Sequence, residues 1–411
     1  MTTLDLVEHA APVDVAMPDD IGVALAESGI ATVAPTRRPG WWRVSAVRKV
    51  GVVVLNGFEV RIAPKIPVAR LLFLLGYARD PNLWRDPPVR FAEVDDLVAA
   101  IAHGFVRQAE RALRHGVLHG YVEREESLTV LRGRLRTADQ LARRHGVPLP
   151  LEVRYDDFVD DIAENRLLRT AALVLAGLPR VPASVAGRLR RLSARLSGAR
   201  LIARREPRPS WAPSRLNAGY VPALRLAELV LDAASIEHGR GAAASSSFLI
   251  DTWRAFEDFV GTALREALAP HGGSLDLQST RDYLDIASRV QLRPDMVWRR
   301  EGSVVAVLDA KYKVETDRGV PEADLYQMLA YCTALGLPRG HLLYARGLGP
   351  VREHRVRRVG TVLSCRALDL DQEPEALLAD VAYVAMELAE EAAVDVQRMS
   401  YRLSETERSQ Q

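Results

Sequence analysis

The chain has 411 residues, of which 48% are hydrophobic and 26% are charged, a composition typical of a globular protein with more than one domain. Its formal net charge of +2 excludes a uniformly basic nucleic-acid-binding protein, so any contact with nucleic acid must come from local patches. Two cysteines exclude a disulfide framework and a cysteine-rich zinc site.

Membrane contact is not expected. No apolar run approaches the roughly 20 residues that a membrane-spanning helix needs. The segment 1–20 is acidic, whereas a secretory signal begins with a basic and then an apolar region. We therefore expect a soluble, cytoplasmic protein.

The first 85 residues are rich in short Val and Ile runs that predict β-strands. Asn56-Gly57 between two such runs is a hairpin-turn signal. The apolar segment 68–78 predicts a helix, and the four-residue spacing of apolar side chains over 91–121 and 161–205 predicts further helices. Residues 1–215 are therefore expected to form a β-rich and helical N-terminal domain.

Three prolines within 207–213 predict a break in regular structure, and we place the domain boundary at residue 215. Residues 216–411 alternate helical and strand patterns, which favours an α/β (α+β) domain with a mixed sheet flanked by helices. We expect its core over 248–345, beginning with a helix near Phe248. A closing helix over 373–397 and a frayed polar tail from residue 404 complete the prediction.

Lysine is rare in this chain, which uses arginine for almost all of its 55 basic residues. Two of the four lysines, Lys311 and Lys313, lie in the short segment DAKYK, directly after an apolar run that ends in Asp309. The stretches 290–298 and 303–313 predict two strands joined by a turn at Gly302. Because side chains alternate along a strand, Asp309 and Lys311 project from the same face.

Asp295, which follows Pro294 on the first of these strands, can bring a second carboxylate to Asp309. Two converging carboxylates suit Mg²⁺, which keeps several waters and takes one or two acidic ligands. A metal ion lowers the pKa of its bound water and neutralises charge that develops on a phosphate. Lys311 is a compact, titratable ammonium that can position or deprotonate the attacking water, whereas Lys313 is a candidate phosphate contact or simply exposed.

Two helices are expected to complete the site. Glu257 shares the apolar stripe of its helix, where a carboxylate is unfavourable unless it is paired or binds metal, so it is a candidate third acidic group. A salt bridge to Arg254 or Arg281 is the alternative. Gln327 and Tyr331 lie one turn apart on the polar face of a later helix, opposite its apolar face.

Gln327 and Tyr331 can hold the lysine, a metal-bound water or a DNA phosphate, or they can belong to a solvated helix face. Together with the acidic residues and the lysine they resemble a PD-(D/E)XK nuclease core with a QxxxY element. RPDMVW, VLDAKYK and DLYQMLAYC are similar to the nuclease segment of the McrC family. The likeness extends, in the family's order, to IAPKIPVARLLFLLGYA, LRGRLR, RYDDFVDDIAENRLLRTAA and FLIDTWRAFEDFV.

This resemblance implies a Mg²⁺-dependent DNA endonuclease subunit of a modification-dependent restriction system, with Mn²⁺ as a substitute metal. It implies that Asp295 and Asp309 are metal ligands, that Glu257 is the helix carboxylate of the core and that Lys311 is catalytic. It also implies a partner, a GTP-hydrolysing AAA+ ring of the McrB type. The N-terminal half would reach into that ring and stimulate hydrolysis, and dimerisation would occur through the complex.

The chain has no phosphate-binding loop of the GxxxxGK[ST] type, because the dipeptide GK never occurs in it. A nucleotide-driven step must therefore be performed by another chain. Two other interpretations remain open: an activator or assembly subunit with a vestigial nuclease centre, and a stand-alone repair nuclease of the same fold.

The segment 188–215 contains nine arginines against a single acid, Glu206. The run is a candidate DNA-backbone patch, a solvated helix face, or the partner of acidic residues in 156–161. The candidate DNA contacts are Lys313, Arg293, Arg188, Arg191 and Arg195.

Overall fold

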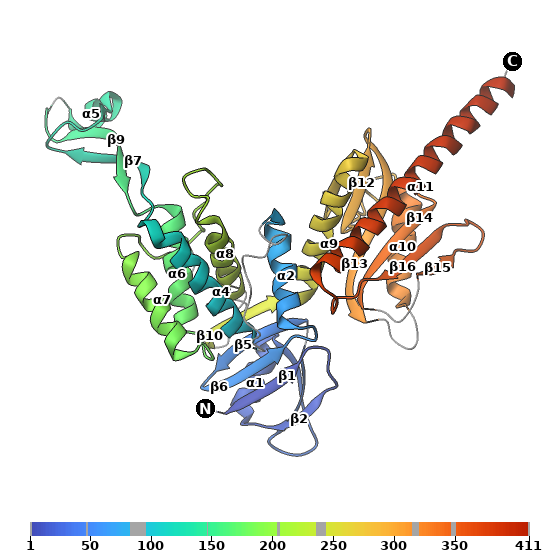
Figure 1. The fold of residues 1–411 in the computed structure, drawn as a ribbon, viewed down its shortest axis with the longest axis horizontal. Helices are drawn as coiled ribbons and strands as arrows, with labels where there is room; N and C mark the ends of the chain where they lie inside the picture. Colours follow the sequence, from blue (N-terminus) through green and yellow to red (C-terminus); the bar gives the residue numbers. More distant parts are fainter. Residues whose placement is uncertain are drawn as a thin grey trace. The chain divides into compact units, whose positions relative to one another are not determined.

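The computed structural model describes residues 2–46, 48–82, 96–145, 147–203, 206–235, 244–314, 320–346 and 351–409. These residues form a mixed α/β architecture with separate helical and sheet regions (Figure 1), which confirms the predicted fold class. Across the described ranges, no helix combines the length and the apolar character that crossing a bilayer requires.

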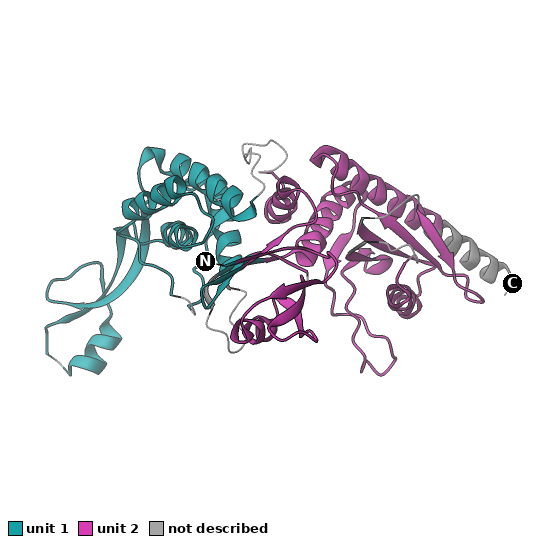
Figure 2. Cartoon of the chain, turned by 90° about the horizontal axis from the view of Figure 1, so that it is seen from below, with its two compact units in different colours: residues 1–2, 52–59, 90–249 teal, residues 3–51, 60–89, 250–411 magenta. Residues whose placement is uncertain are grey.

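The chain divides into two compact units (Figure 2). The first contains residues 1–2, 52–59 and 90–249, and the second contains residues 3–51, 60–89 and 250–411. This division differs from the boundary expected at residue 215, because most of the N-terminal strands belong to the same unit as residues 250–411.

The first unit is built on a group of four packed helices, α4 (Leu97–Ala112), α6 (Ala163–Ala176), α7 (Ala183–Arg195) and α8 (Val221–Ser235). The helix predicted over 91–121 is shorter than expected. It begins at Leu97, where the Asp96 carboxylate accepts a 3.1 Å hydrogen bond from the Ala99 N–H, and a strand has begun by Gly120.

A three-stranded sheet extends away from these helices within the first unit (Figure 1). Its order is β7 (Gly120–Leu128), β9 (Leu151–Val159) and β8 (Arg134–Leu135), and helix α5 (Thr137–Arg144) precedes β9.

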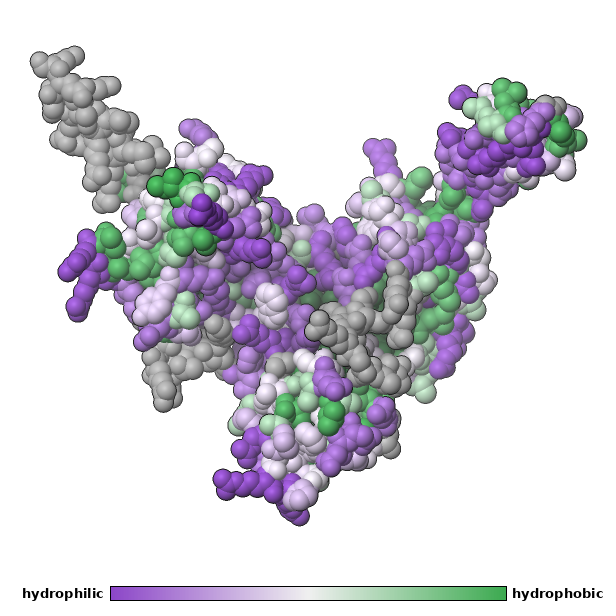
Figure 3. Space-filling model, turned by 180° about the vertical axis from the view of Figure 1, so that it is seen from behind, coloured by the Kyte–Doolittle hydropathy of each residue, from purple (hydrophilic) through white to green (hydrophobic). Residues whose placement is uncertain are grey.

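Neither β7 nor α5 contains a buried residue. Tyr121, Phe158 and Leu141 are 76%, 60% and 69% exposed, and hydrophobic patches lie beside hydrophilic ones on this tip (Figure 3). The sheet therefore presents apolar side chains that no core of its own covers.

In the second unit, β2 (Val13–Ala16), β4 (Trp41–Ala46) and β3 (Ala31–Pro35) form a small sheet beside helix α1 (Asp19–Ser28). The helix approaches the sheet closely, since a Cβ at Gly22 would lie 2.2 Å from the Trp42 ring. Only glycine fits at this contact.

A four-stranded sheet has the order β1 (Thr3–Val7), β6 (Phe58–Ala63), β5 (Lys49–Leu55) and β10 (Ala244–Asp251). Asn56 and Gly57 between β5 and β6 have φ values of 46° and 79°, which confirms the predicted hairpin turn. The helix expected near Phe248 is wrong at its start. Phe248 is fully buried in β10, and helix α9 (Thr252–Leu268) begins only at Thr252.

The six-stranded sheet of the second unit positions the predicted site. Its order is β11 (Ser274–Leu277), β12 (Met296–Arg300), β13 (Ser303–Val314), β14 (Arg339–Arg346), β16 (Val362–Ala367) and β15 (Arg352–Arg355). Strands β12 and β13 form the predicted antiparallel hairpin around Gly302, whereas β13, β14 and β16 are parallel. The first hairpin strand begins at Met296 and not at residue 290, because Pro294 donates no ladder hydrogen bond.

Helices cover both faces of this sheet (Figure 1). Helix α10 (Glu322–Leu335) packs Met328 and Cys332 into one core with Val307 and Leu342, so it covers the β13 face that also carries Asp309. Helices α9 and α11 (Pro374–Ser409) pack against β13 as well, and α2 (Val68–Arg79) packs on α9. The closing helix predicted over 373–397 is α11, and the tail expected to fray is helical where it is described.

Candidate active site

Asp295 and Asp309 come together at one end of the β12–β13 hairpin. Asp295 stands directly before β12, and the register pairs Met296 with Leu308, the neighbour of Asp309. The Ala310 backbone N–H donates a 2.8 Å hydrogen bond to Asp295 Oδ2, and the Asp295 N–H donates a 3.3 Å bond to Asp309 Oδ1. The convergence of the two carboxylates was foreseeable from strand alternation and the turn at Gly302.

Lys311 projects beside Asp309, with which its ammonium forms an ion pair. Lys311 Nζ also donates a 3.2 Å hydrogen bond to Gln327 Oε1. Burial by itself would lower the pKa of Lys311, but the negative charges of Asp309, Asp295 and Asp324 outweigh it and raise that pKa. The ammonium is therefore protonated at neutral pH.

Asp309 is only 1% exposed. Its Oδ2 atom is buried in contact with the Lys311 ammonium. A buried carboxylate is unfavourable unless it is paired, and in this metal-free structure the lysine supplies that pairing.

Two acidic groups of the site, Asp295 and Glu257, have raised pKa values. Burial, followed by the charges of Asp309 and Glu257, raises the pKa of Asp295. Burial raises the pKa of Glu257 to about 7, and Asp309 adds to the effect while Lys311 opposes it. Glu257 on α9 thus shares the electrostatic field of the two aspartates. Arg281, one of its alternative partners, instead lies 3.5 Å from Asp276.

Among the described residues, no group of three or more His, Cys, Asp or Glu side chains is arranged to hold a metal ion. Glu257 therefore does not complete a three-carboxylate cluster with Asp295 and Asp309 in this conformation. The set that the structure brings together is two aspartates and one lysine.

Gln327 and Tyr331 extend the site into a chain of hydrogen bonds. Gln327 Nε2 donates to the Tyr331 hydroxyl at 2.8 Å, and that hydroxyl donates to the Arg293 carbonyl at 3.1 Å. The chain runs from Lys311 to the backbone two residues before Asp295. These two polar residues thus connect the lysine to the loop that carries the first aspartate.

The core-facing stripe predicted for α10 is confirmed, because Met328 and Cys332 lie in the core. The face predicted to be polar is not uniformly solvated: Tyr331 and Asp324 are buried, whereas Gln327 is exposed. Asp324 Oδ2 accepts a 3.2 Å hydrogen bond from the Tyr344 hydroxyl on β14. The sequence places Asp324 on the correct helix face but contains no local sign of its partner twenty residues away.

The candidate DNA contacts lie in different surroundings. Arg293 is exposed next to the site, and Arg191 is exposed on α7 of the first unit. Arg188 pairs with Glu110 at 2.9 Å, and Arg195 donates a 2.7 Å hydrogen bond to the Leu113 carbonyl. The acidic partners in 156–161 considered for the arginine run are not the partners of these two. The side chain of Lys313 lies outside the described part of the chain.

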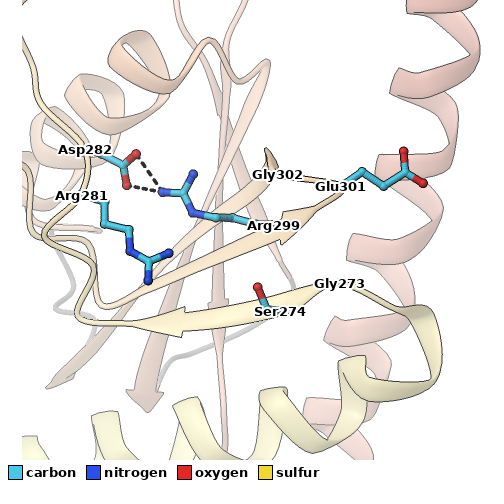
Figure 4. A pocket seen from close by; sticks show the side chains of 7 residues that line it. All are labelled: Gly273, Ser274, Arg281, Asp282, Arg299, Glu301 and Gly302. Atoms are coloured by element: carbon cyan, nitrogen blue, oxygen red, sulfur yellow. Dashed lines mark hydrogen bonds and ion pairs between the residues drawn. The ribbon is translucent and has the colours of Figure 1, made fainter.

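A separate cavity of about 450 Å³ opens at the turn end of the β12–β13 hairpin. Arg299 points into it and donates to both Asp282 carboxylate oxygens, at 2.8 and 2.6 Å (Figure 4). Arg300 pairs with Ser303 there, whereas Asp295 and Asp309 lie at the opposite end, about 17 to 20 Å along the strands at ~3.3 Å per residue. Arg281 and Arg299 at this cavity are paired with nearby aspartates, and it is not the site built by Asp295 and Asp309.

Comparison with known proteins shows which family this chain belongs to. A family model described as "McrBC 5-methylcytosine restriction system component" matches residues 44–345. The chain belongs to the McrBC restriction family. Every residue of the candidate active site lies within the range matched by the McrBC family model.

Two solved structures are similar to the chain. One is the half-complex from a tetradecameric assembly of Thermococcus gammatolerans McrB AAA+ hexamers with bound McrC. The match has a TM-score of 0.58 and 18% sequence identity, and it covers 93% of this chain and 99% of that one. The other, the T. gammatolerans McrBC complex, covers 65% of this chain and 88% of that one, with a TM-score of 0.41 and 17% identity. No curated protein sequence matches the chain.

Proposed function

We propose that the chain is the Mg²⁺-dependent DNA endonuclease subunit of an McrBC-type, modification-dependent restriction system, with a PD-(D/E)XK nuclease centre. The observation that carries this proposal is the arrangement of Asp295, Asp309 and Lys311 at one end of the hairpin. Both carboxylates are fixed to backbone N–H groups, and the lysine lies beside the more deeply buried one. Membership of the McrBC family supports the same function.

The residues present fit a divalent cation. Oxygen donors from two aspartates suit Mg²⁺, which takes one or two carboxylates and keeps several waters, and Mn²⁺ accepts the same donors. The fit rests on this donor set, because the two carboxylates converge at one end of the hairpin and are each held by a backbone N–H. Asp295 and Asp309 would hold it, and Glu257 would bond its waters. When bound, the ion would supply an activated water and charge neutralisation at the scissile phosphate.

Lys311 would supply a compact positive charge that positions the attacking water, or would deprotonate it once a bound cation neutralises the two aspartates. In the metal-free protein the charges of Asp309 and Asp295 raise the pKa of Lys311, so its ammonium is protonated there. Held by Asp309 and Gln327, it donates hydrogen bonds toward the reacting phosphate and orients the nucleophile. The hydrogen-bond chain through Gln327 and Tyr331 restrains this ammonium.

The proposed partner is an AAA+ ring of the McrB type that hydrolyses GTP. The chain has no phosphate-binding loop of its own. The similar T. gammatolerans assembly contains McrB AAA+ hexamers with bound McrC. The thin β7–β9–β8 sheet, with its exposed Tyr121, Phe158 and Leu141, is the surface that we assign to this partner. Apolar side chains that no core covers mark an interaction site.

The test is cleavage of methylated and unmethylated plasmid by the purified chain, with and without the co-encoded AAA+ protein and GTP. The proposal predicts Mg²⁺-dependent cleavage of methylated DNA by the complete mixture and none by Lys311→Ala. Cleavage that is unchanged by Lys311→Ala would identify a vestigial centre. Robust cleavage by the chain alone would identify a stand-alone nuclease.

A further inference from the structure

We propose that Glu8 is a positioning residue for DNA cleavage, which holds the strand of Asp309 and Lys311 and the helix of Glu257 in their working arrangement. This inference rests on the nuclease function proposed above. Glu8 lies outside the range matched by the family model and more than 240 residues from Thr252 and Tyr312 in the sequence.

Glu8 follows β1 and belongs to the second unit, as do all its partners. It is 1% exposed, and burial raises the pKa of its carboxyl group. One carboxylate oxygen accepts a hydrogen bond from the Thr252 hydroxyl, and the other accepts one from the Tyr312 hydroxyl at 3.2 Å. The backbone of Lys65 provides a further hydrogen bond. One buried side chain thus joins four segments that are remote in sequence.

Two of these segments carry the site. Tyr312 directly follows Lys311 on β13 and projects from the opposite face, so its hydroxyl fixes the strand from behind. Thr252 is the first residue of α9, five residues before Glu257. The Tyr312 ring also lies 6.0 Å from that of Phe256, the neighbour of Glu257. The carboxylate of Glu8 therefore sets the distance between the strand and the helix behind the acidic groups.

A buried carboxylate is a poor way to gain stability alone, since apolar packing of similar volume is often as favourable. A polar network in which every group is hydrogen-bonded instead fixes the elements that it joins in one relative position. Cleavage needs that precision, because displacement of a reacting group by about 1 Å can lower a rate about 100-fold. The position of Glu8, with one oxygen on each element, matches this role.

The closing experiment compares Glu8→Ala, Glu8→Gln and Tyr312→Phe in the full chain with its partner. The matched control is Glu59→Ala, which removes another buried glutamate, paired with Arg180 at 2.9 Å in the first unit. Lys311→Ala reports on the nuclease centre itself. Each protein is measured for single-turnover cleavage, DNA affinity, melting temperature and amide hydrogen exchange.

We expect Glu8→Ala and Tyr312→Phe to slow single-turnover cleavage by about 10- to 100-fold with DNA affinity unchanged. Glu8→Gln recovers most of the rate, because its amide still bonds both hydroxyl groups. Hydrogen exchange accelerates over 309–312 and 252–257 in Glu8→Ala and stays unchanged there in Glu59→Ala. The mild Tyr312→Phe variant keeps the test valid where Glu8→Ala fails to fold.

Wild-type cleavage rates in folded Glu8→Ala or in Tyr312→Phe, with Lys311→Ala inactive, would overturn this proposal alone. The carboxylate would then stabilise the fold in the same way as Glu59. Absence of cleavage by the wild-type complex would overturn the nuclease function and this inference together.

Discussion

Asp295 and Asp309 are fixed by hydrogen bonds that cross between their two strands. The Asp295 N–H donates to Asp309 Oδ1 at 3.3 Å, and Asp295 Oδ2 accepts from the N–H of Ala310 at 2.8 Å. Because each carboxylate is tied to the other strand's backbone, neither depends on a freely rotating side chain. The two acidic groups are thus pre-organised before any ligand arrives.

Lys311→Arg tests whether the site needs a compact ammonium. The Lys311 side chain is 17% exposed and contacts Asp309 and Gln327, and arginine would replace its compact ammonium with a wide planar guanidinium. We expect single-turnover cleavage to fall about 100-fold while DNA affinity is retained, because the positive charge remains. The control is Lys49→Arg, the same substitution on β5. Cleavage by Lys311→Arg at close to the wild-type rate would contradict the assigned role.

Glu257→Gln should change how the stability of the metal-free protein depends on pH. The pKa of Glu257 is raised from 4.5 to about 7, so between these values the folded state binds more protons than the unfolded state. The free energy of unfolding therefore falls as pH rises through that window. Urea denaturation should show that the free energy of unfolding falls between pH 5 and pH 8 in both proteins. We expect the fall to be larger in wild type than in Glu257→Gln by about 1 to 2 kcal/mol, allowing for solvent screening.

The control for this measurement is Glu322→Gln, which changes an exposed glutamate on α10 and should keep the wild-type pH dependence. Parallel pH profiles for wild type and Glu257→Gln would show that Glu257 is ionised normally. That result would contradict the claim that burial and the charge of Asp309 raise the pKa of Glu257.

Tyr331→Phe should affect both stability and cleavage. The hydroxyl is buried, accepts from Gln327 at 2.8 Å and donates to the Arg293 carbonyl at 3.1 Å. Its removal should lower the free energy of unfolding by about 1 to 2 kcal/mol, because the carbonyl loses its donor. Cleavage should fall about 10-fold, because the chain that holds Lys311 is interrupted.

Tyr326→Phe is the matched control for this change, since Tyr326 lies on the same helix and is 67% exposed. We expect it to leave unfolding and cleavage unaltered. If Tyr331→Phe loses stability but cleaves DNA at the wild-type rate, Tyr331 stabilises the fold and has no role in holding Lys311 for cleavage.

The arginines should separate into DNA contacts and structural residues. Arg293 and Arg191 are exposed, whereas Arg188 is paired with Glu110 and Arg195 with the Leu113 carbonyl. We expect Arg293→Ala and Arg191→Ala each to lower the slope of DNA affinity against salt concentration by about one unit. Arg188→Ala and Arg195→Ala should leave the slope unchanged. DNA affinity is measured by fluorescence anisotropy over a series of salt concentrations. An equal decrease of the slope in all four variants would contradict the division into DNA contacts and structural residues.

Local patterns in the sequence were sufficient for the central part of the site. Side-chain alternation places Asp309 and Lys311 on one face, and the turn at Gly302 returns the chain so that Asp295 meets them. The four-residue spacing also places Gln327 and Tyr331 together. Each of these relationships spans fewer than forty residues along the chain.

Long-range contacts could not be inferred in the same way. Nothing in the sequence around Glu8 indicates that it meets Tyr312, because a buried acidic residue looks like an exposed one until the fold is known. The apolar residues around Phe248 fit both the helical and the strand periodicity, and the sequence therefore predicts a helix there. In the structure this segment is strand β10 of a sheet. The apolar side of α10 does face the core, but the sequence does not predict that Tyr331 and Asp324 are also buried, because their polar partners come from other segments.

The most direct test of the central claim is anomalous diffraction from a crystal of the chain grown with Mn²⁺. We predict one strong anomalous peak about 2.1 Å from a carboxylate oxygen of Asp295 and of Asp309, with Lys311 nearby. An anomalous map without a peak at that position, with Asp309 still paired with Lys311, would contradict a metal-dependent nuclease centre.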